Sequence, residues 1–143
     1  MDKSEILALR RAVLEKDFAR MNERQKQAVF TVNGPLLILA GAGSGKTTVL
    51  INRIANILRY GDAYNSTYLR DDLDENDIAA CKAYIENGTP LTTETQEHLS
   101  VSACAPWRIM AITFTNKAAG ELKDRLCTML GETASDIWAS TFH

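Results

Sequence analysis

Hydrophobic residues along this chain follow a helical period in some segments and form short continuous runs in others, so helices are expected to alternate with strands. In the first twenty positions, apolar residues recur at helical spacing between charged ones: Ile6, Leu9, Val13 and Phe18. A second helix is expected to begin at Asn22, because Asn is a favoured N-cap and Gln25 completes a capping box three residues later. The chain therefore opens with two predicted helices.

The first predicted strand is the apolar run Leu36–Leu39, which follows a helix-breaking Asn-Gly-Pro sequence at 33–35. A glycine-rich loop comes next and leads into a helix from about Gly45 to Tyr60. The apolar positions of this helix form an expected core stripe: Val49, Leu50, Ile54 and Ile57 or Leu58.

The core pattern resumes at Ile109–Thr113, a run that is compatible with a buried parallel strand. Thr115 or Asn116 can cap the following helix, which is expected to close at Gly131. A third strand is expected at Ile137–Thr141. Strands that alternate with helices in this way are typical of an α/β fold, with a parallel sheet and right-handed crossovers.

The segment Gly61–Ala105 interrupts this order and reads as an insertion with one short helical candidate, Asp77–Glu86. Between Asp62 and Ala105 there are nine acids and two bases, so a chain with a net charge of −2 carries −7 here and +5 elsewhere. A basic body suits polyanionic partners and an acidic segment does not. Charge alone leaves open that both are simply solvated surfaces.

The 143 residues suit a single domain that can bury a core. No apolar stretch approaches the length of a membrane span, and the polar start at residues 1–5 does not resemble a signal peptide, so we expect a cytoplasmic protein without a membrane segment. The three cysteines are widely spaced and are expected to be ordinary thiols: Cys81, Cys104 and Cys127.

Residues 40–48 carry the clearest chemical signal, because they read Ala-Gly-Ala-Gly-Ser-Gly-Lys-Thr-Thr directly after the first predicted strand. Glycines let the backbone wrap a phosphate with its N–H groups pointing inward, Lys46 can reach the β and γ phosphates, and the Thr47 hydroxyl can ligate Mg²⁺. The usual pattern begins with Gly and this one begins with Ala40. The motif predicts that the chain binds ATP and Mg²⁺. The alternative interpretation of residues 40–48 is an unrelated glycine-rich turn.

Four segments together resemble motifs of the UvrD, Rep and PcrA group of superfamily-one DNA helicases. Residues 21–29 resemble the Q motif, residues 39–48 resemble motif I, residues 111–119 resemble motif Ia, and residues 140–143 resemble the opening of motif Ib. The resemblance implies a P-loop NTPase of the RecA-like kind, a parallel sheet flanked by helices, truncated before the Walker B strand. It divides the chain into an N-terminal helix (1–20) and a partial first RecA-like domain (21–143) with an acidic insertion at about 61–105.

The resemblance also implies roles for individual residues. The expected nucleotide contacts are Gln25, Ala42, Gly43, Ser44, Gly45, Lys46, Thr47 and Thr48, with Lys46 and Thr47 as the catalytic residues and Thr47 as the metal ligand. The expected contacts to single-stranded DNA are Phe114, Asn116, Thr141 and His143. Two alternatives stay open, since Gln25 can serve as a capping-box residue and Phe114 can belong to the core.

The intact protein is then expected to be an ATP-dependent DNA helicase that translocates on single-stranded DNA and unwinds duplex junctions in replication or repair. Its other partner would be the remainder of the helicase. Phosphoryl transfer also needs metal-holding carboxylates and usually an arginine. None of these follows Thr141, so we expect this chain alone to lack ATP hydrolysis. The alternatives are a binding module without turnover, the motor of a RecB-like or AddA-like helicase-nuclease, and a small-molecule kinase. The last would leave the Q-like and Ia-like segments unexplained.

Overall fold

The computed structural model describes residues 1–37 and 45–141 and shows a mixed α/β architecture. In chain order the helices and strands are α1 Lys3–Asp17, α2 Glu23–Phe30, α3 Lys46–Arg59, α4 Glu75–Asn87, α5 Thr93–Leu99, β1 Met110–Thr113, α6 Asn116–Leu130 and β2 Trp138–Thr141. Short 3-10 turns precede β1 and β2, at Pro106–Arg108 and Glu132–Asp136. Within the described residues, no helix is both long and apolar enough to cross a membrane.

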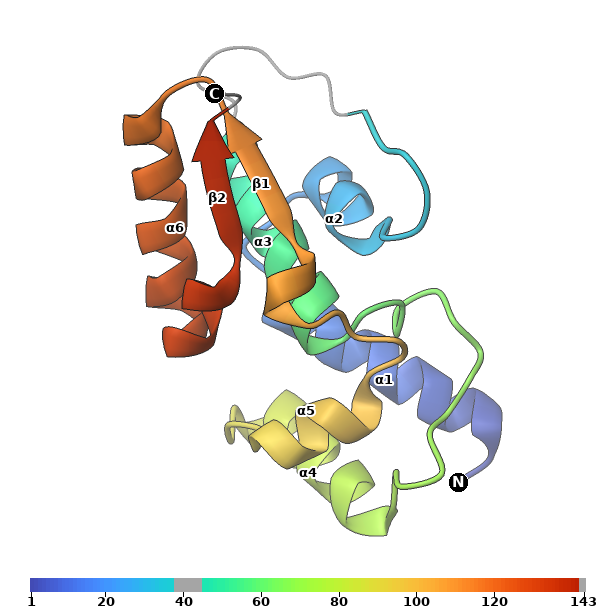
Figure 1. Cartoon of the computed structure of the whole chain (residues 1–143). Coiled ribbons are helices and arrows are strands. Elements are labelled where there is room, and N and C mark those ends of the chain that lie inside the picture. Colours follow the sequence, from blue (N-terminus) through green and yellow to red (C-terminus); the bar gives the residue numbers. More distant parts are fainter. Residues whose placement is uncertain (38–44, 142–143) are drawn as a thin grey trace.

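The two strands lie side by side and run parallel, joined by α6 (Figure 1). Their register pairs Met110 with Trp138 and Thr113 with Thr141, so the two strands start and end together. This confirms the predicted parallel pairing of these segments. Side chains alternate between two faces along a strand. On one face, β1 buries Ala111 among the helices, and on the other Met110 and Ile112 are exposed.

Helix α3 lies between two hydrophobic clusters and contributes to both. Val49 and Ala55 pack with residues of α1, α2, α4 and α5, whereas Ile51 and Ile54 pack with Ala111 of β1 and with α6. Figure 1 shows α3 behind the two strands, with α2 on its far side from α6. The helix is therefore the element that joins the two halves of the core.

Two expectations about apolar residues fail. Leu50 was expected in the core stripe of α3 but is 39% exposed, because the buried faces of the helix point to α2 on one side and to β1 and α6 on the other. Leu36 and Leu37 belong to no strand and are exposed, Leu37 by 81%. The remaining residues of that predicted strand, Ile38 and Leu39, lie outside the described residues.

The helix ends that the sequence marks most clearly are confirmed. Asn22 and Gln25 form a reciprocal capping box at the start of α2, with both side chain to backbone bonds at 2.9 Å. The Thr115 hydroxyl accepts a bond from the Ala118 amide at 3.0 Å and caps α6. Gly131 ends α6 with φ +78°, a backbone conformation that other residues rarely adopt.

The acidic segment contains two helices, α4 and α5, where the sequence predicted only one. Its ends meet, because the Asp62 amide donates to the Val101 carbonyl at 2.8 Å and the Val101 amide donates to the Tyr60 carbonyl at 2.9 Å. Gly61 has φ +60°, and a Cβ there would lie 2.1 Å from the Val101 oxygen, so the junction requires glycine. The segment thus leaves and rejoins the core at one point.

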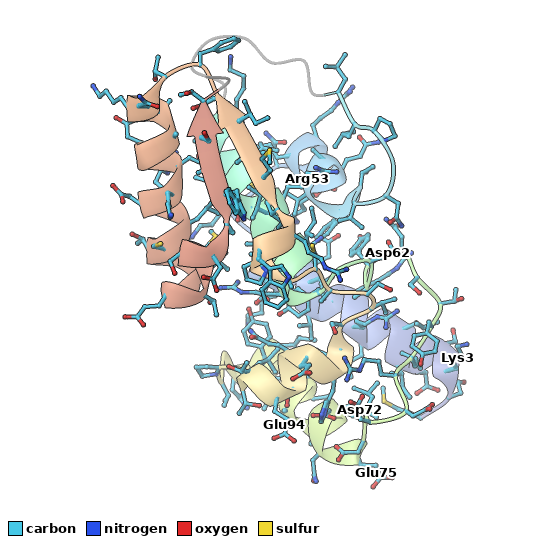
Figure 2. All side chains as sticks on the ribbon, viewed as in Figure 1. Lys3, Arg53, Asp62, Asp72, Glu75 and Glu94 are labelled. Atoms are coloured by element: carbon cyan, nitrogen blue, oxygen red, sulfur yellow. The ribbon has the colours of Figure 1, made fainter. Side chains whose placement is uncertain are left out.

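Helices α4 and α5 are joined by a polar cluster around His98, whose acidic surroundings appear at the lower end of the molecule (Figure 2). The Asp77 carboxylate meets His98 Nδ1 at 2.8 Å and accepts the Thr95 hydroxyl at 2.9 Å. The Asp77 bond, with weaker help from Asp72 and Glu94, raises the pKa of His98 above its ordinary 6.5. Burial raises the pKa of Asp77, but bonds from the Asp74 amide, His98 and Thr95 outweigh it, and the pKa lies below 3.8.

These shifts predict that contact between α4 and α5 weakens as the pH rises. A raised folded pKa at His98 stabilises the fold fully below pH 6.5, and that contribution is lost as the pH rises through the folded pKa. The lowered pKa of Asp77 acts at the other end, since its contribution is lost as the pH falls below 3.8 through the folded value. We therefore expect a plateau of stability between about pH 4 and 6.5.

The measurement is the free energy of unfolding by denaturant between pH 5 and 9, for the native chain and for His98→Gln. The native chain should lose stability above the plateau, and the variant should lack that pH-dependent part. Equal pH profiles for the two proteins would show that His98 does not carry the effect.

Candidate functional site

The first turn of α3 provides exposed polar groups at a helix end that no described side chain caps. Gly45 is the N-cap, with φ +79° and ψ 27°, and Lys46 and Thr47 follow as exposed residues. The first helical bond runs from the Val49 amide to the Gly45 carbonyl at 3.0 Å. The first amides of an α-helix have no partner within the helix and point along its axis with the positive end of the dipole, and among the described residues no side chain caps those of α3. Such an end is suited to an anion.

Gln25 lies beside this turn. Its Oε1 accepts the Asn22 amide in the capping box, which confirms the structural role that the sequence left open. Its Nε2 lies 3.5 Å from the position that a Cβ on Gly45 would occupy. The structure therefore brings Gln25 and the start of α3 together, although twenty residues separate them in the chain.

Thr48 faces α6 in this structure. Its hydroxyl oxygen accepts a bond from Arg125 Nη2 at 3.1 Å, and its carbonyl accepts the Asn52 side-chain amide at 2.8 Å. Arg125 is a neighbour that sequence reasoning missed, because the contact spans 77 positions and depends on how α3 packs against α6.

A cleft of about 900 Å³ opens next to Thr48, between the end of α1, α3 and α6. Three basic side chains lie on its wall: Lys16, Arg20 and Arg125. Apolar groups such as Met21 and Ile51 line it as well. A cleft with apolar walls and a few polar groups is the usual form of a small-molecule site, and this one adjoins the helix end described above.

The predicted DNA contacts lie where β1 and β2 end. Phe114 follows β1 directly and is 86% exposed, so its interpretation as a core residue is wrong. Asn116 is the exposed first residue of α6, and Thr141 lies opposite Thr113 in the strand register. The structure therefore brings Phe114 and Asn116 of one segment and Thr141 of another to one edge of the sheet. The remaining predicted site residues fall outside the described residues: Ala42, Gly43, Ser44 and His143.

Cysteines and carboxylates of the described part offer no metal centre. All three cysteines are free, as predicted, and no group of three or more His, Cys, Asp or Glu residues in that part is arranged to hold an ion. A metal ion at this site would need the Thr47 hydroxyl and oxygens of a bound phosphate. Thr47 is exposed in the second position of α3, which fits that role.

Residues 21–69 and 89–143 match the family model described as "UvrD/REP helicase N-terminal domain". The chain belongs to this family. Proteins named ATP-dependent DNA helicase PcrA from Leuconostoc citreum, Bacillus subtilis and Staphylococcus aureus are each 40% identical to it over 123 or 124 residues, which is 86% of this chain. The matched part is 11% of the length of each of these relatives.

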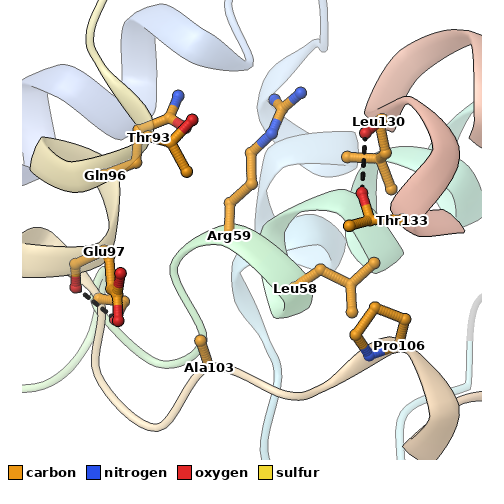
Figure 3. Close-up of a pocket in the computed structure, with 10 residues that line it drawn as sticks. Leu58, Arg59, Thr93, Gln96, Glu97, Ala103, Pro106, Leu130 and Thr133 are labelled. Carbon is orange, nitrogen blue, oxygen red and sulfur yellow. Dashed lines mark hydrogen bonds between the residues drawn. The ribbon is translucent and has the colours of Figure 1, made fainter.

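The family match covers the candidate site but leaves two segments of this UvrD/REP helicase N-terminal domain unmatched. Helix α1 precedes the first matched residue, and α4 falls between residues 69 and 89. A second hollow, of about 630 Å³, lies at the opposite end of α3 around Arg59 and is lined by Thr93 and Gln96 of α5 and by Leu130 (Figure 3). Its lining contains none of the predicted site residues that the structure describes.

Replacing Gly45 by Ala tests whether the backbone at this site is specified by glycine. The new Cβ would make only an ordinary contact with Gln25, so the cost is conformational, about 1–2 kcal/mol for a left-handed residue. We expect Gly45→Ala to lower the free energy of unfolding by about 1 kcal/mol or more in denaturant titrations.

Gly120→Ala is the matched control. Gly120 lies inside α6, and a Cβ there would meet nothing within 4 Å, so this change should stabilise the chain by about 0.5–1 kcal/mol. Two changes of equal sign would contradict the assigned backbone conformation of Gly45.

Proposed function

We propose that this chain is the ATP-binding part of an ATP-dependent DNA helicase with a P-loop NTPase, RecA-like fold. Residues 40–48 would hold the triphosphate, Lys46 would neutralise the β and γ phosphates, and Thr47 would ligate Mg²⁺. The bound Mg²⁺ would supply charge for the phosphoryl group, while the side chains of this chain bind and orient the nucleotide.

The observation that carries this proposal is the meeting of Gln25 with Gly45 at the start of α3. The Nε2 group of Gln25 can donate to a base while the helix end receives phosphates, and the capping box holds its Oε1 in place. The adjoining cleft of about 900 Å³ has room for a nucleoside, and Arg20 and Arg125 give it positive charge.

For the intact protein we propose translocation on single-stranded DNA and unwinding at duplex junctions. The relatives that support this carry the name ATP-dependent DNA helicase PcrA. Phe114 offers an exposed ring on which a base can stack without sequence preference, while Asn116 and Thr141 offer polar groups for the backbone. The remainder of the helicase would be the other partner.

Binding without turnover is the second proposal for the 143-residue chain. Hydrolysis needs carboxylates that hold the metal and orient water, and no such cluster exists among the described residues. We further propose that residues 61–105 are an acidic insertion outside the DNA path. Figure 2 shows Asp72, Glu75 and Glu94 at the end of the molecule opposite the ends of β1 and β2, and their charge would repel phosphates.

Lys46→Ala is expected to remove nucleotide binding. Without the ammonium group the β and γ phosphates lose their main cation, so affinity for a fluorescent non-hydrolysable ATP analogue should fall by about a hundredfold or more. Fluorescence titration with Mg²⁺ present measures it. Lys82→Ala, a change at an exposed lysine of α4, is the control and should bind as the native chain does. Native affinity in Lys46→Ala would refute the proposed phosphate site.

Phe114→Ala is expected to weaken binding of single-stranded DNA. Loss of one stacked base costs about 1–3 kcal/mol, which is roughly 5- to 150-fold in affinity. Anisotropy of a labelled oligonucleotide, at fixed salt, measures the change. Tyr68→Ala removes another exposed aromatic ring, in the acidic segment, and should leave the affinity unaltered. An equal loss in both variants would mean that the effect is not local to the edge of the sheet.

A further inference from the structure

The last turn of α1 carries two carboxylates, and each receives hydrogen bonds from two other segments. Asp17 accepts the hydroxyl groups of Tyr60 and Tyr84, one on each oxygen. Glu15 accepts the Tyr64 hydroxyl at 2.5 Å on one oxygen and pairs with Lys26 at 2.8 Å on the other. Hydrogen bonds to charged groups are among the strong ones in proteins, so these contacts hold their partners firmly.

The partners of these carboxylates come from the nucleotide site on one side and from α4 on the other. Tyr60 is the fully buried residue that ends α3, the helix whose start carries Lys46. Lys26 follows Gln25 in α2. Tyr84 lies near the end of α4. The end of α1 is therefore a shared anchor for both helices of the candidate site and for the acidic segment.

Helix α4 rests on the same turn through a second set of contacts. Lys16 donates to the carbonyl groups of Tyr84 at 2.6 Å and Ile85 at 3.2 Å, and its ammonium lies 4.9 Å from the centre of the Tyr84 ring. A lysine at this place satisfies carbonyl groups near the end of α4 and complements its dipole. Movement of α4 would break these bonds or pull the end of α1 with it.

The tyrosines keep their protons as donors throughout the accessible pH range. Burial, followed by the charge and bond of Asp17, raises the pKa of Tyr60 far above its ordinary 10, and burial with the Asp17 bond raises the pKa of Tyr84 in the same direction. Helices α1 and α4 both lie outside the residues that match the family model. The two unmatched helices thus contact each other, and α1 meets the matched helices α3 and α2 at Asp17 and Glu15.

We propose that α4 is a control element for the nucleotide site, which acts on α2 and α3 through Glu15 and Asp17. Release of α4 from α1 loosens the hold of Asp17 on Tyr60 and of Glu15 on Lys26, and thereby lowers the affinity for nucleotide. By linkage, a bound nucleotide strengthens the attachment of α4 by the same factor. This inference rests on the proposed nucleotide binding, but the mechanical coupling of the helices does not require it.

The test uses Tyr84→Phe in the full 143-residue chain, because the change removes one hydroxyl and keeps the ring beside Lys16. Hydrogen–deuterium exchange without nucleotide should rise in α4 and also in α2 and at the end of α3, while α6 serves as an internal reference. Affinity for the fluorescent ATP analogue should fall about fivefold or more. Tyr68→Phe, an exposed tyrosine of the same segment, is the matched control and should change neither measurement.

The outcomes separate the coupling from the nucleotide proposal. Faster exchange confined to α4, with unchanged affinity, would overturn the coupling and leave a local structural bond. Faster exchange in α6 as well as in α2, α3 and α4 would mean general destabilisation and would also overturn the coupling. If the native chain binds no analogue, the proposed function fails, and the exchange pattern in α2 and α3 still decides the coupling. Combining Tyr60→Phe with Tyr84→Phe should give a non-additive exchange effect, since both hydroxyls act on one carboxylate.

Discussion

The structure depends on the burial of α3 on two sides. Val49 and Ala55 face one cluster and Ile51 and Ile54 face the other, so this helix cannot rotate without exposing apolar surface on one of them. That constraint fixes the direction of its first turn, where Gly45 is the N-cap and no described side chain caps the first amides. The position of the candidate site thus follows from how residues further along the same helix are packed.

Polar contacts join the acidic segment to this core, in addition to the apolar packing of residues such as Cys81 and Leu99. Arg10 is 1% exposed and donates to the carbonyl groups of Ser66 and Tyr68 at 2.8 and 2.7 Å, and Asp17 links Tyr60 with Tyr84. A hydrogen bond to a charged group contributes about 1.5–3 kcal/mol, comparable to a buried aliphatic side chain. Such bonds also specify geometry, which is why a displacement of α4 has consequences beyond its own contacts.

Local signals in the sequence predicted local structure, but they did not predict contacts between residues far apart in the chain. The capping box of Asn22 and Gln25, the Thr115 cap and the Gly131 end of α6 involve groups within a few positions of one another, and all were predictable. The exposure of Leu50 depends on which faces of α3 meet neighbours, and the packing of α5 on α4 depends on contacts such as that of Thr95 with Asp77. No local sequence pattern predicts the bond from Arg125 to Thr48, because the two residues are 77 positions apart.

The arrangement of α3 and α6 explains why nucleotide and DNA candidates lie at one end of the molecule. Thr48 contacts Arg125 near the start of α3, and Arg59 contacts the Met129 carbonyl near its end, so the two helices run in the same direction. Helix α6 begins directly after β1, and therefore both helices begin at the carboxyl ends of the parallel strands. In α/β sheets that edge is where ligands bind, because helix N-termini and strand ends converge there. A nucleotide at Lys46 and a base on Phe114 would consequently bind at the same edge of the sheet.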